Sequence, residues 1–367
     1  METFELRILG TLFRCQAVDS ACFRFLESFQ NAYAGNERQK TVKTLFVQIK
    51  SLDWDPGSWI PLETVPVHKS SAMPEWNIDA VKMEGPEKRI AYHLPNRLIH
   101  VETDLERDRI GIRFQKEIQP AYLGEAVFHI CRSYALYLRP LGILLHASGV
   151  KMEKGAVLFC GNSLSGKTTL LLEMIHRFGG YPLCNDRAFL PSAEPSKIIS
   201  WPGYISMCEG TILNYPSLRN AALEYENGVY PYKTAEYGKE IRNIFDKRMG
   251  TKRMYPMEWL QTAMGKPYIE ECEIRTLVFP RVSLEYVEPE LQPLDPAFYS
   301  QEITALMEEA SFALNEDAFL PWHGLPFPPT STALAAFDAL VAAGVRFFRL
   351  RISPLQLNRL EKLSLQF

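Results

Sequence analysis

The sequence has few of the features that define special classes of protein. No apolar run approaches the roughly 18 residues that a membrane span needs, and the first residues, METFELRILGTLFRC, carry a charge at Glu2 and alternate like a strand. The 7 cysteines are widely spread and never form a C-x-x-C pair, so neither a zinc site nor a disulfide framework is indicated. These absences predict a cytoplasmic protein with free thiols and no membrane association.

Charge of one sign is also lacking. The formal net charge is −3 and the pI is near 6.2, so the chain has no overall field that would hold a polyanion, and no nucleic-acid partner is expected. Apolar residues make up 47% and charged residues 23%, which is typical of soluble globular proteins. No internal repeat or low-complexity tract interrupts the 367 residues, a length that allows two domains.

Strand-like and helical patterns alternate along the chain and predict an α/β fold. Residues 1–120 form the expected N-terminal α/β domain, and residues 121–367 form the expected second domain with a C-terminal helical and strand extension. In the first domain we expect strands at 4–9 and 43–51, a helix at 17–35 closed by Gly35, an exposed loop at 54–76 and a β-hairpin at 97–115.

The second domain begins with an expected helix at 121–140 that ends at Pro140. The expected strands are 142–150, 155–161, 181–191 and 275–287, and the expected helices are 168–178, 303–314 and 355–365. Residues 195–270 are expected to be mainly loops around short elements, and residues 332–352 a helix, a glycine stop and a strand.

The stretch CGNSLSGKTTLLLE contains the clearest motif. Gly161, Gly166, Lys167 and Thr168 satisfy G-x-x-x-x-G-K-[ST] between an apolar strand and a long helix. Glycines let backbone N–H groups face inward around phosphates, the lysine supplies a positive charge, and the threonine hydroxyl can ligate Mg²⁺. The predicted nucleotide-binding residues are Gly161, Asn162, Ser163, Leu164, Ser165, Gly166, Lys167, Thr168 and Thr169.

Asp186 lies 19 positions beyond Lys167, on the first strand expected after the helix. A carboxylate there can ligate Mg²⁺ together with Thr168, or accept the proton of an attacking hydroxyl. Arg187 can neutralise charge on a moving phosphoryl group, although strand alternation places it on the face opposite Asp186. His146 closes an apolar strand that we expect to lie against the strand that enters the glycine turn. The predicted catalytic residues are therefore Asp186, His146, Lys167 and Arg187.

Other nucleotide-dependent machines fit less well. The chain has no N-K-x-D string for guanine recognition, and its one LSG string lies inside the turn itself, not downstream as in ABC-type ATPases. The short spacing to the acidic residue favours a phosphotransferase.

The order of a strand ending in His146, a hairpin, GNSLSGKTT, one helix and Asn185-Asp186-Arg187 resembles the nucleotide-binding core of the HPr kinase/phosphorylase family. That family includes peptide serine kinases of ribosomally made peptide pathways and shares its core fold with PEP carboxykinase. The resemblance covers about residues 140–191. It implies a P-loop core, transfer of the γ-phosphoryl group of ATP to a serine hydroxyl, and Mg²⁺ as the cofactor.

The chain departs from that family in two places, one of which is the family's downstream E-I-R-G segment, which has no clean counterpart here. HPr kinases carry two successive aspartates where this chain has Asn185 and then Asp186, which leaves a reverse phosphorylase activity and the identity of the base open. The leading hypothesis is an ATP- and Mg²⁺-dependent kinase that acts on a serine or threonine of a peptide or small protein. A small-molecule (metabolite) kinase and a nucleotide-gated binding protein with weak ATPase activity are the alternatives. The acceptor, the nucleotide base and a homo-oligomeric state stay open.

Overall fold

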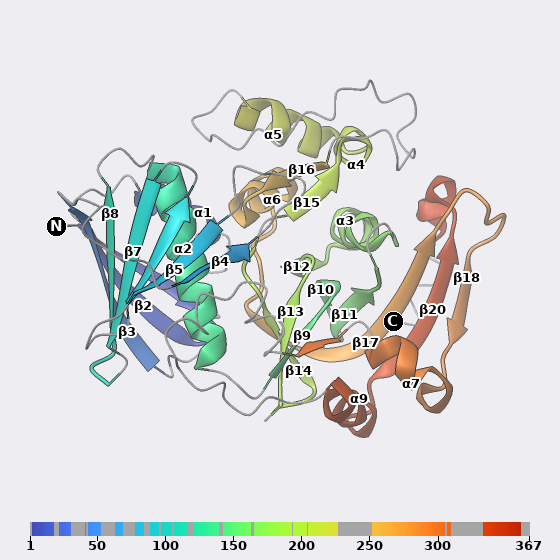
Figure 1. Ribbon diagram of the computed structural model, residues 1–367. Helices are drawn as coiled ribbons and strands as arrows, with labels where there is room; N and C mark the ends of the chain where they lie inside the picture. Colours follow the sequence, from blue (N-terminus) through green and yellow to red (C-terminus); the bar gives the residue numbers. More distant parts are fainter. Residues whose placement is uncertain are drawn as a thin grey trace. The chain divides into compact units, whose positions relative to one another are not determined.

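The structure is a computed structural model in which the chain folds into two compact units (Figure 1). The described residues up to 138 belong to the first unit, and those from 142 belong to the second. Helix α2 (Pro120–Tyr137) packs in the first unit, whereas the sequence analysis assigned residues from 121 onward to the second domain. The structure describes residues 2–17, 22–30, 41, 43–52, 63–68, 78–83, 89–94, 97–104, 106–115, 120–138, 142–162, 165–192, 194–203, 205–226, 252–304, 307–309 and 333–360.

The first unit contains an 8-stranded mixed sheet in the order β1-β2-β3-β8-β7-β6-β5-β4. β3 is parallel to both β2 and β8, and the other neighbours are antiparallel. Its strands are β1 (Glu2–Ile8), β2 (Thr11–Ala17), β3 (Lys43–Leu52), β4 (Glu63–His68), β5 (Ile78–Met83), β6 (Arg89–Leu94), β7 (Arg97–Asp104) and β8 (Arg109–Gln115).

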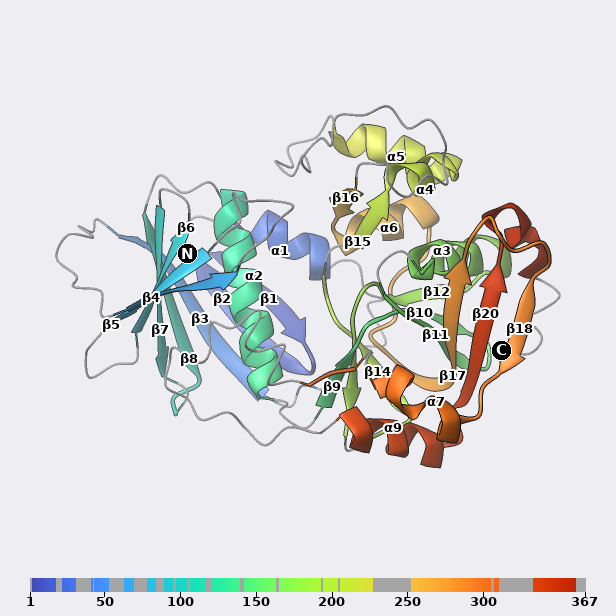
Figure 2. The ribbon, with the colours of Figure 1, turned by 45° about the vertical axis from the view of Figure 1, so that its right-hand side comes forward.

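Alternating apolar residues explain how this sheet is covered. Leu45, Val47 and Ile49 of β3 are buried, while the residues between them are more exposed, which is the period of a half-covered strand. Helix α1 (Phe23–Gln30) and α2 pack against each other and against β1 (Figure 2). The rings of Phe29 and Phe128 stack with centroids 4.0 Å apart between the two helices. The α/β class predicted from the sequence is confirmed here.

The second unit contains a 10-stranded mixed sheet among the described residues, in which β12-β10-β11-β17-β14-β13-β9-β19 is the main path and β20 pairs with β17 and β18. Strands β11, β17 and β20 are parallel, so their carboxyl ends lie at one edge. The strands are β9 (Gly142–Leu145), β10 (Ala147–Met152), β11 (Gly155–Cys160), β12 (Tyr181–Cys184), β13 (Ala188–Pro191), β14 (Lys197–Ser200), β17 (Glu271–Val282), β18 (Glu290–Pro293), β19 (Met307–Glu309) and β20 (Arg346–Ile352).

Helices cover both faces of this sheet. α3 (Lys167–Phe178) packs on β10, β11 and β12, and α9 (Ala333–Ala342) packs on β9 and β19 and against α7 (Pro296–Thr304). A 3₁₀ helix (Pro354–Leu360) contributes to the core on the α3 side. A separate two-stranded sheet, β15 (Ile205–Cys208) with β16 (Lys252–Tyr255), accompanies α4 (Glu209–Leu213), α5 (Pro216–Glu226) and α6 (Met257–Met264).

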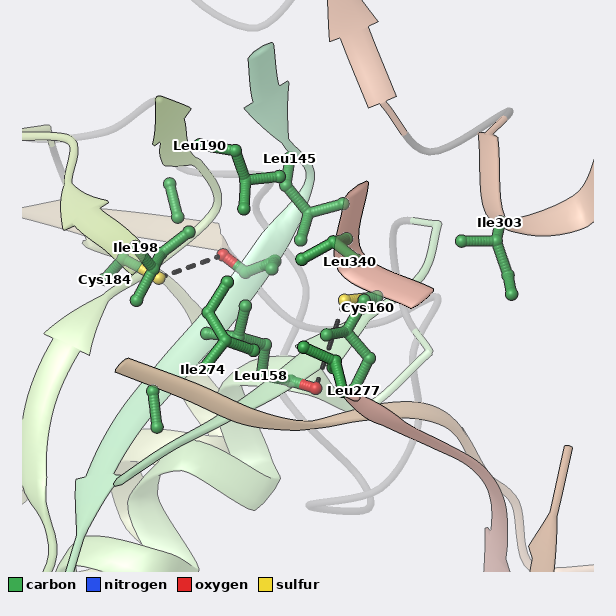
Figure 3. Packing of buried hydrophobic residues seen from close by; sticks show 14 of the residues in the cluster. Leu145, Leu158, Cys160, Cys184, Leu190, Ile198, Ile274, Leu277, Ile303 and Leu340 are labelled. Carbon is green, nitrogen blue, oxygen red and sulfur yellow. Dashed lines mark hydrogen bonds between the residues drawn. The ribbon is translucent and has the colours of Figure 1, made fainter. Parts of the chain in front are cut away.

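The two faces of the sheet enclose separate apolar cores. On the α7 and α9 side, the core residues include Leu145, Leu158, Cys160, Cys184, Leu190, Ile198, Ile274, Leu277, Ile303 and Leu340 (Figure 3). On the α3 side, Leu170 and Met174 meet Val157 and Val278 of the sheet. Strands buried on both faces read as continuous apolar runs, as GILL and GAVLFC do. The edge that carries the carboxyl ends of β11 and β17 is thereby held between two packed layers.

Several expected elements are confirmed. The hairpin of β7 and β8, helix α3 ended by Gly179, and the run from α9 through Gly344 to β20 all match. The hairpin of β10 and β11 is also present, but the strand expected at 142–150 is two strands: β10 pairs with β11, whereas β9 pairs with β13 and β19. Strand β17 covers the first part of the strand expected at 275–287 and ends at Val282. None of the helices in the described part of the chain is long and apolar enough to cross a membrane.

Other expectations were wrong. The single strand expected at 181–191 is two strands, β12 and β13, which lie in different parts of the sheet. The helix expected at 303–314 gives way to β19, because residues 307–309 pair with β9. The loop expected at 54–76 contains β4, which pairs with β5. Residues 195–270, expected as loops around short elements, hold the short strands and helices from β14 to α6 among the described residues. Gly35, expected to close a helix, lies outside the described residues.

Candidate functional site

The glycine turn joins β11 to α3 as the sequence predicts. Gly166 has φ 101, and a Cβ atom there would lie 2.1 Å from Cγ2 of Val282, so both the backbone conformation and the space require glycine. The amide of Val282, at the end of β17, donates to the carbonyl of Ser165 at 3.1 Å and ties the turn to the neighbouring parallel strand. A Cβ atom at Gly161 would lie 2.8 Å from Oγ of Ser165. The space at Gly161 and Gly166 therefore leaves no room for a larger side chain at either position.

Lys167 begins α3 and folds back over the turn. Its ammonium donates hydrogen bonds to the carbonyl oxygens of Gly161 and, at 3.0 Å, of Asn162. The residue is only 7% exposed, so a positive charge is fixed at the first residues of the turn. Ser165 Oγ is buried and has no hydrogen-bond partner among the described residues. Backbone amides at a helix start, a fixed cation and a buried hydroxyl are the groups that a phosphate requires.

The threonines follow on the first turn of α3. Thr168 and Thr169 are half-buried, and the Thr168 hydroxyl donates to Oδ1 of Asn185 at 3.1 Å. Asn185 is 9% exposed and directly follows β12. The same oxygen accepts a second hydrogen bond, from the hydroxyl of Ser148 on β10, at 2.9 Å. Residues 163 and 164, which were predicted to bind nucleotide as Ser163 and Leu164, lie outside the described part of the chain.

His146 and Asp186 meet at the same edge. His146 separates β9 from β10, and its Nε2 lies 3.2 Å from Oδ1 of Asp186. The Asp186 carboxylate is 59% exposed while the imidazole is 24% exposed, so the carboxylate is the group that a ligand can reach. The His146 carbonyl also accepts the amide of Gly161 at 3.4 Å, and the Asp186 carbonyl accepts the amide of Ala147 at 3.1 Å. The first bond links His146 to the start of the glycine turn, and the second links Asp186 to the residue that follows His146.

The backbone of Asp186 explains the break in the expected strand. Its φ is 74, in the left-handed region that a strand residue does not occupy. Arg187 is half-buried on the same connection. Strand alternation, from which Arg187 was expected on the face opposite Asp186, does not apply here, because residues 185–187 join two strands and do not continue one.

The cysteines near the turn are inert. All 7 cysteines are free thiols. Burial raises the pKa of the Cys160 and Cys184 thiols well above the ordinary value, although the Lys167 charge acts in the opposite direction at Cys160. Raised pKa values keep both thiols neutral, so they act as core residues beneath the site (Figure 3).

The glycine-turn helix is anchored at its middle. Glu173 is 2% exposed on α3, and its carboxylate accepts a hydrogen bond from the Tyr215 hydroxyl at 2.6 Å and pairs with Arg177 one turn along the helix. Burial, followed by the charge of Glu173, raises the pKa of the Tyr215 hydroxyl above its ordinary value. Tyr215 lies between α4 and α5, so this network joins the β15–α6 group to α3.

The sequence predictions and the structure meet at one edge of the sheet. His146, Gly161, Gly166, Lys167, Thr168 and Asp186 come together there. The sequence reasoning treated Asn185 only as a missing carboxylate and missed Ser148; the position of Asn185 directly before Asp186 was the available signal. No three histidine, cysteine, aspartate or glutamate side chains among the described residues form a group that could hold a metal ion. No protein-family model matches the chain, and no curated protein is significantly similar to it in sequence.

Proposed function

We propose that this protein is a cytoplasmic, ATP- and Mg²⁺-dependent kinase that transfers the γ-phosphoryl group to a serine or threonine hydroxyl of a peptide or small protein. The nucleotide-binding core would be of the HPr kinase and PEP carboxykinase type, within the second unit, and the first unit, which includes α2, would recognise the acceptor. One observation carries the proposal: the His146–Asp186 pair is bonded through its backbone to the first glycine of a G-x-x-x-x-G-K-T turn.

The glycine turn would hold the phosphates. Amides of the turn and of the first residues of α3 would donate to the phosphates, and the Lys167 ammonium would exchange its two carbonyl partners for phosphate oxygens. Carbonyls are neutral acceptors, so a charged phosphate is the stronger partner for the ammonium. The buried Oγ of Ser165 supplies one more donor. These groups stabilise negative charge in the transition state without reorganising the fold.

The site also suits a magnesium ion. The hydroxyl of Thr168 and the exposed carboxylate of Asp186 would hold it. Magnesium bound there would neutralise negative charge on the phosphates and polarise the phosphoryl group that is transferred. The lack of a three-residue ligand group among the described side chains fits a cation that takes most of its oxygens from phosphates and water.

Asp186 would act on the acceptor. The acceptor oxygen forms its bond to the γ-phosphorus while the bond from that phosphorus to the β–γ bridging oxygen breaks, and ADP leaves. The acceptor proton passes to the Asp186 carboxylate, which His146 orients through its hydrogen bond to Oδ1. Arg187, on the same connection, would offset charge on the moving phosphoryl group.

A separate first unit supports a bulky acceptor over a metabolite. The 8-stranded sheet and its two helices form a compact body of their own before the glycine turn. A metabolite kinase needs no second body to recognise its substrate, whereas a peptide or protein offers a large surface to bind.

The test combines acceptor, nucleotide and one substitution. The protein is incubated with ATP, Mg²⁺ and candidate peptides; ADP release is measured, and products are searched by mass spectrometry for an added phosphate. Lys167→Ala should lower turnover by at least about 10²-fold, because the fixed positive charge is lost. The matched control is Lys154→Ala, in the exposed turn between β10 and β11, which should leave turnover unchanged. Acceptor-independent ADP release would instead support the nucleotide-gated binding protein, and full activity of Lys167→Ala would exclude the proposed site.

A further inference from the structure

One amide oxygen between β12 and α3 receives two hydroxyl groups. Oδ1 of Asn185 accepts Thr168 Oγ1 at 3.1 Å and Ser148 Oγ at 2.9 Å. A carbonyl oxygen has two lone pairs, so these two donors saturate it. Ser148 and Asn185 are both buried, and both belong to strand ends that form the packed sheet.

The arrangement fixes the chemical role of Thr168. A hydroxyl has one proton and two lone pairs, and the proton of Thr168 is committed to Asn185. What the hydroxyl presents on its other side is therefore lone pairs. Lone pairs suit a cation and repel a phosphate oxygen. Asn185 thus makes Thr168 a cation ligand while being unable to serve as one itself through a saturated oxygen.

The same arrangement leaves the site with little negative charge. Asn185 is neutral, and the nearby carboxylate, Asp186, is 59% exposed and shares an oxygen with His146. Lys167 adds a positive charge on the same turn. Within the described residues no cluster of three potential metal-ligating side chains exists. One carboxylate and one hydroxyl do not compensate a divalent cation for the water ligands that it loses on binding. The cation therefore needs further anionic oxygens as ligands.

We propose that Asn185 is a positioning residue that makes this site bind a divalent cation only together with the phosphates of a nucleotide. The inference rests on the proposed nucleotide site and adds an order to its loading: the cation enters as its nucleotide complex. A carboxylate at position 185 would accept the same two hydroxyl bonds and add a full negative charge. The side chain at 185 therefore decides whether the empty site attracts the cation.

The test measures cation binding, independent of turnover. Mn²⁺ is titrated into the full-length protein and free Mn²⁺ is followed by electron paramagnetic resonance, without nucleotide and with ADP. Wild type should bind Mn²⁺ only when ADP is present. Asn185→Asp should bind Mn²⁺ without ADP, at Mn²⁺ concentrations where wild type binds none, because the neighbouring hydroxyls favour the ionised carboxylate.

Two further variants separate position from charge. Asn220→Asp adds the same charge on the exposed surface of α5 and should leave Mn²⁺ binding unchanged. Asn185→Leu removes the acceptor, so Thr168 can donate elsewhere; it should weaken Mn²⁺ binding in the presence of ADP about 10-fold or more, with ADP alone still bound. Circular dichroism checks that each variant is folded.

The outcomes distinguish this inference from the proposed function. Binding of a fluorescent ADP analogue is measured in the same samples without metal. If wild type binds the analogue but takes up Mn²⁺ equally well with and without ADP, or if Asn185→Asp behaves as wild type, the role of Asn185 is overturned and the kinase proposal stands. If wild type binds no nucleotide at all, both fall together.

Discussion

Asp108 in the first unit and Asp186 in the second have matching backbones and different surroundings. Both are left-handed, with φ 56 and 74, and each carbonyl accepts an amide from another strand, from Phe46 at 2.8 Å and from Ala147 at 3.1 Å. The carboxylate of Asp108 pairs with the Lys43 ammonium at 2.6 Å, whereas that of Asp186 meets His146. An aspartate with positive φ thus closes an ordinary hairpin in the first unit, whereas in the second unit it presents a carboxylate beside the glycine turn.

The difference lies in how the strands continue. Around Asp108, β7 and β8 pair without interruption up to the hairpin tip. Around Asp186, two neighbouring strand pairs break at the same level: His146 separates β9 from β10, and residues 185–187 separate β12 from β13. At the double break, the Asn185 side chain accepts the Ser148 hydroxyl, and the Asp186 carbonyl accepts the Ala147 amide. His146, Asn185 and Asp186 therefore lie together where β9 gives way to β10 and β12 gives way to β13.

The largest expected effect is on turnover, and it should follow the loss of the carboxylate charge at Asp186 but not at Asp108. Asp186→Asn should lower turnover about 10²- to 10⁴-fold, because the group that accepts the acceptor proton is lost while asparagine tolerates the left-handed backbone. Asp108→Asn, the matched change, should leave turnover unchanged, since its carboxylate only pairs with Lys43. Turnover is measured as acceptor-dependent ADP release, and thermal unfolding confirms that both variants are folded. Equal losses in the two variants would mean that the comparison reflects stability and not chemistry.

Two glycines with positive φ allow a smaller effect to be resolved. Gly166→Ala combines a left-handed backbone with a Cβ atom 2.1 Å from Val282, whereas Gly265→Ala, at φ 65 after α6, meets nothing within 4 Å. The second change should cost about 1–2 kcal/mol of unfolding free energy, and the first about 2–5 kcal/mol, because crowding adds to conformation. Urea unfolding monitored by circular dichroism gives both values. Losses of the same size would show that Val282 moves aside and that the contact between β17 and the turn is loose.

The glycine turn and its helix could be predicted because the information is local. Gly161, Gly166, Lys167 and Thr168 stand within eight residues, and the apolar periods on either side separate strand from helix. The α9–Gly344–β20 run succeeded for the same reason. Local signals are enough where a turn carries its own glycines.

The break at 185–187 could not be predicted because its cause is distant in sequence. YPLCNDRAFLP is apolar at both ends, and three polar residues inside it do not decide between a bulge, a turn and a solvent-facing stretch. The partners that hold Asn185 are Ser148 and Thr168, 37 and 17 residues away. Strand β19 was missed for a similar reason, since residues 307–309 become extended by pairing with β9. Tertiary pairing outweighed the local helical pattern in this segment.

The smallest expected effect compares a buried network with an exposed pair. Tyr215→Phe removes the hydroxyl that satisfies the buried Glu173 carboxylate, and should lower the free energy of unfolding by about 1–3 kcal/mol. In the first unit, Glu5→Gln removes an ion pair with Arg14 whose side chains are more than half exposed, and should cost less than about 1 kcal/mol.

The pH dependence identifies the Tyr215 bond specifically. Burial and Glu173 raise the pKa of the Tyr215 hydroxyl, so the folded state keeps its proton after the unfolded chain has lost it. The stability that this hydroxyl contributes is therefore complete below the ordinary tyrosine pKa of about 10 and declines as the pH rises above it. The difference between wild type and Tyr215→Phe in urea unfolding should shrink between about pH 10 and pH 11, while the difference between wild type and Glu5→Gln stays constant. A Tyr215→Phe difference that does not change with pH would mean that the hydroxyl is exposed to water and that α3 is not anchored through Glu173.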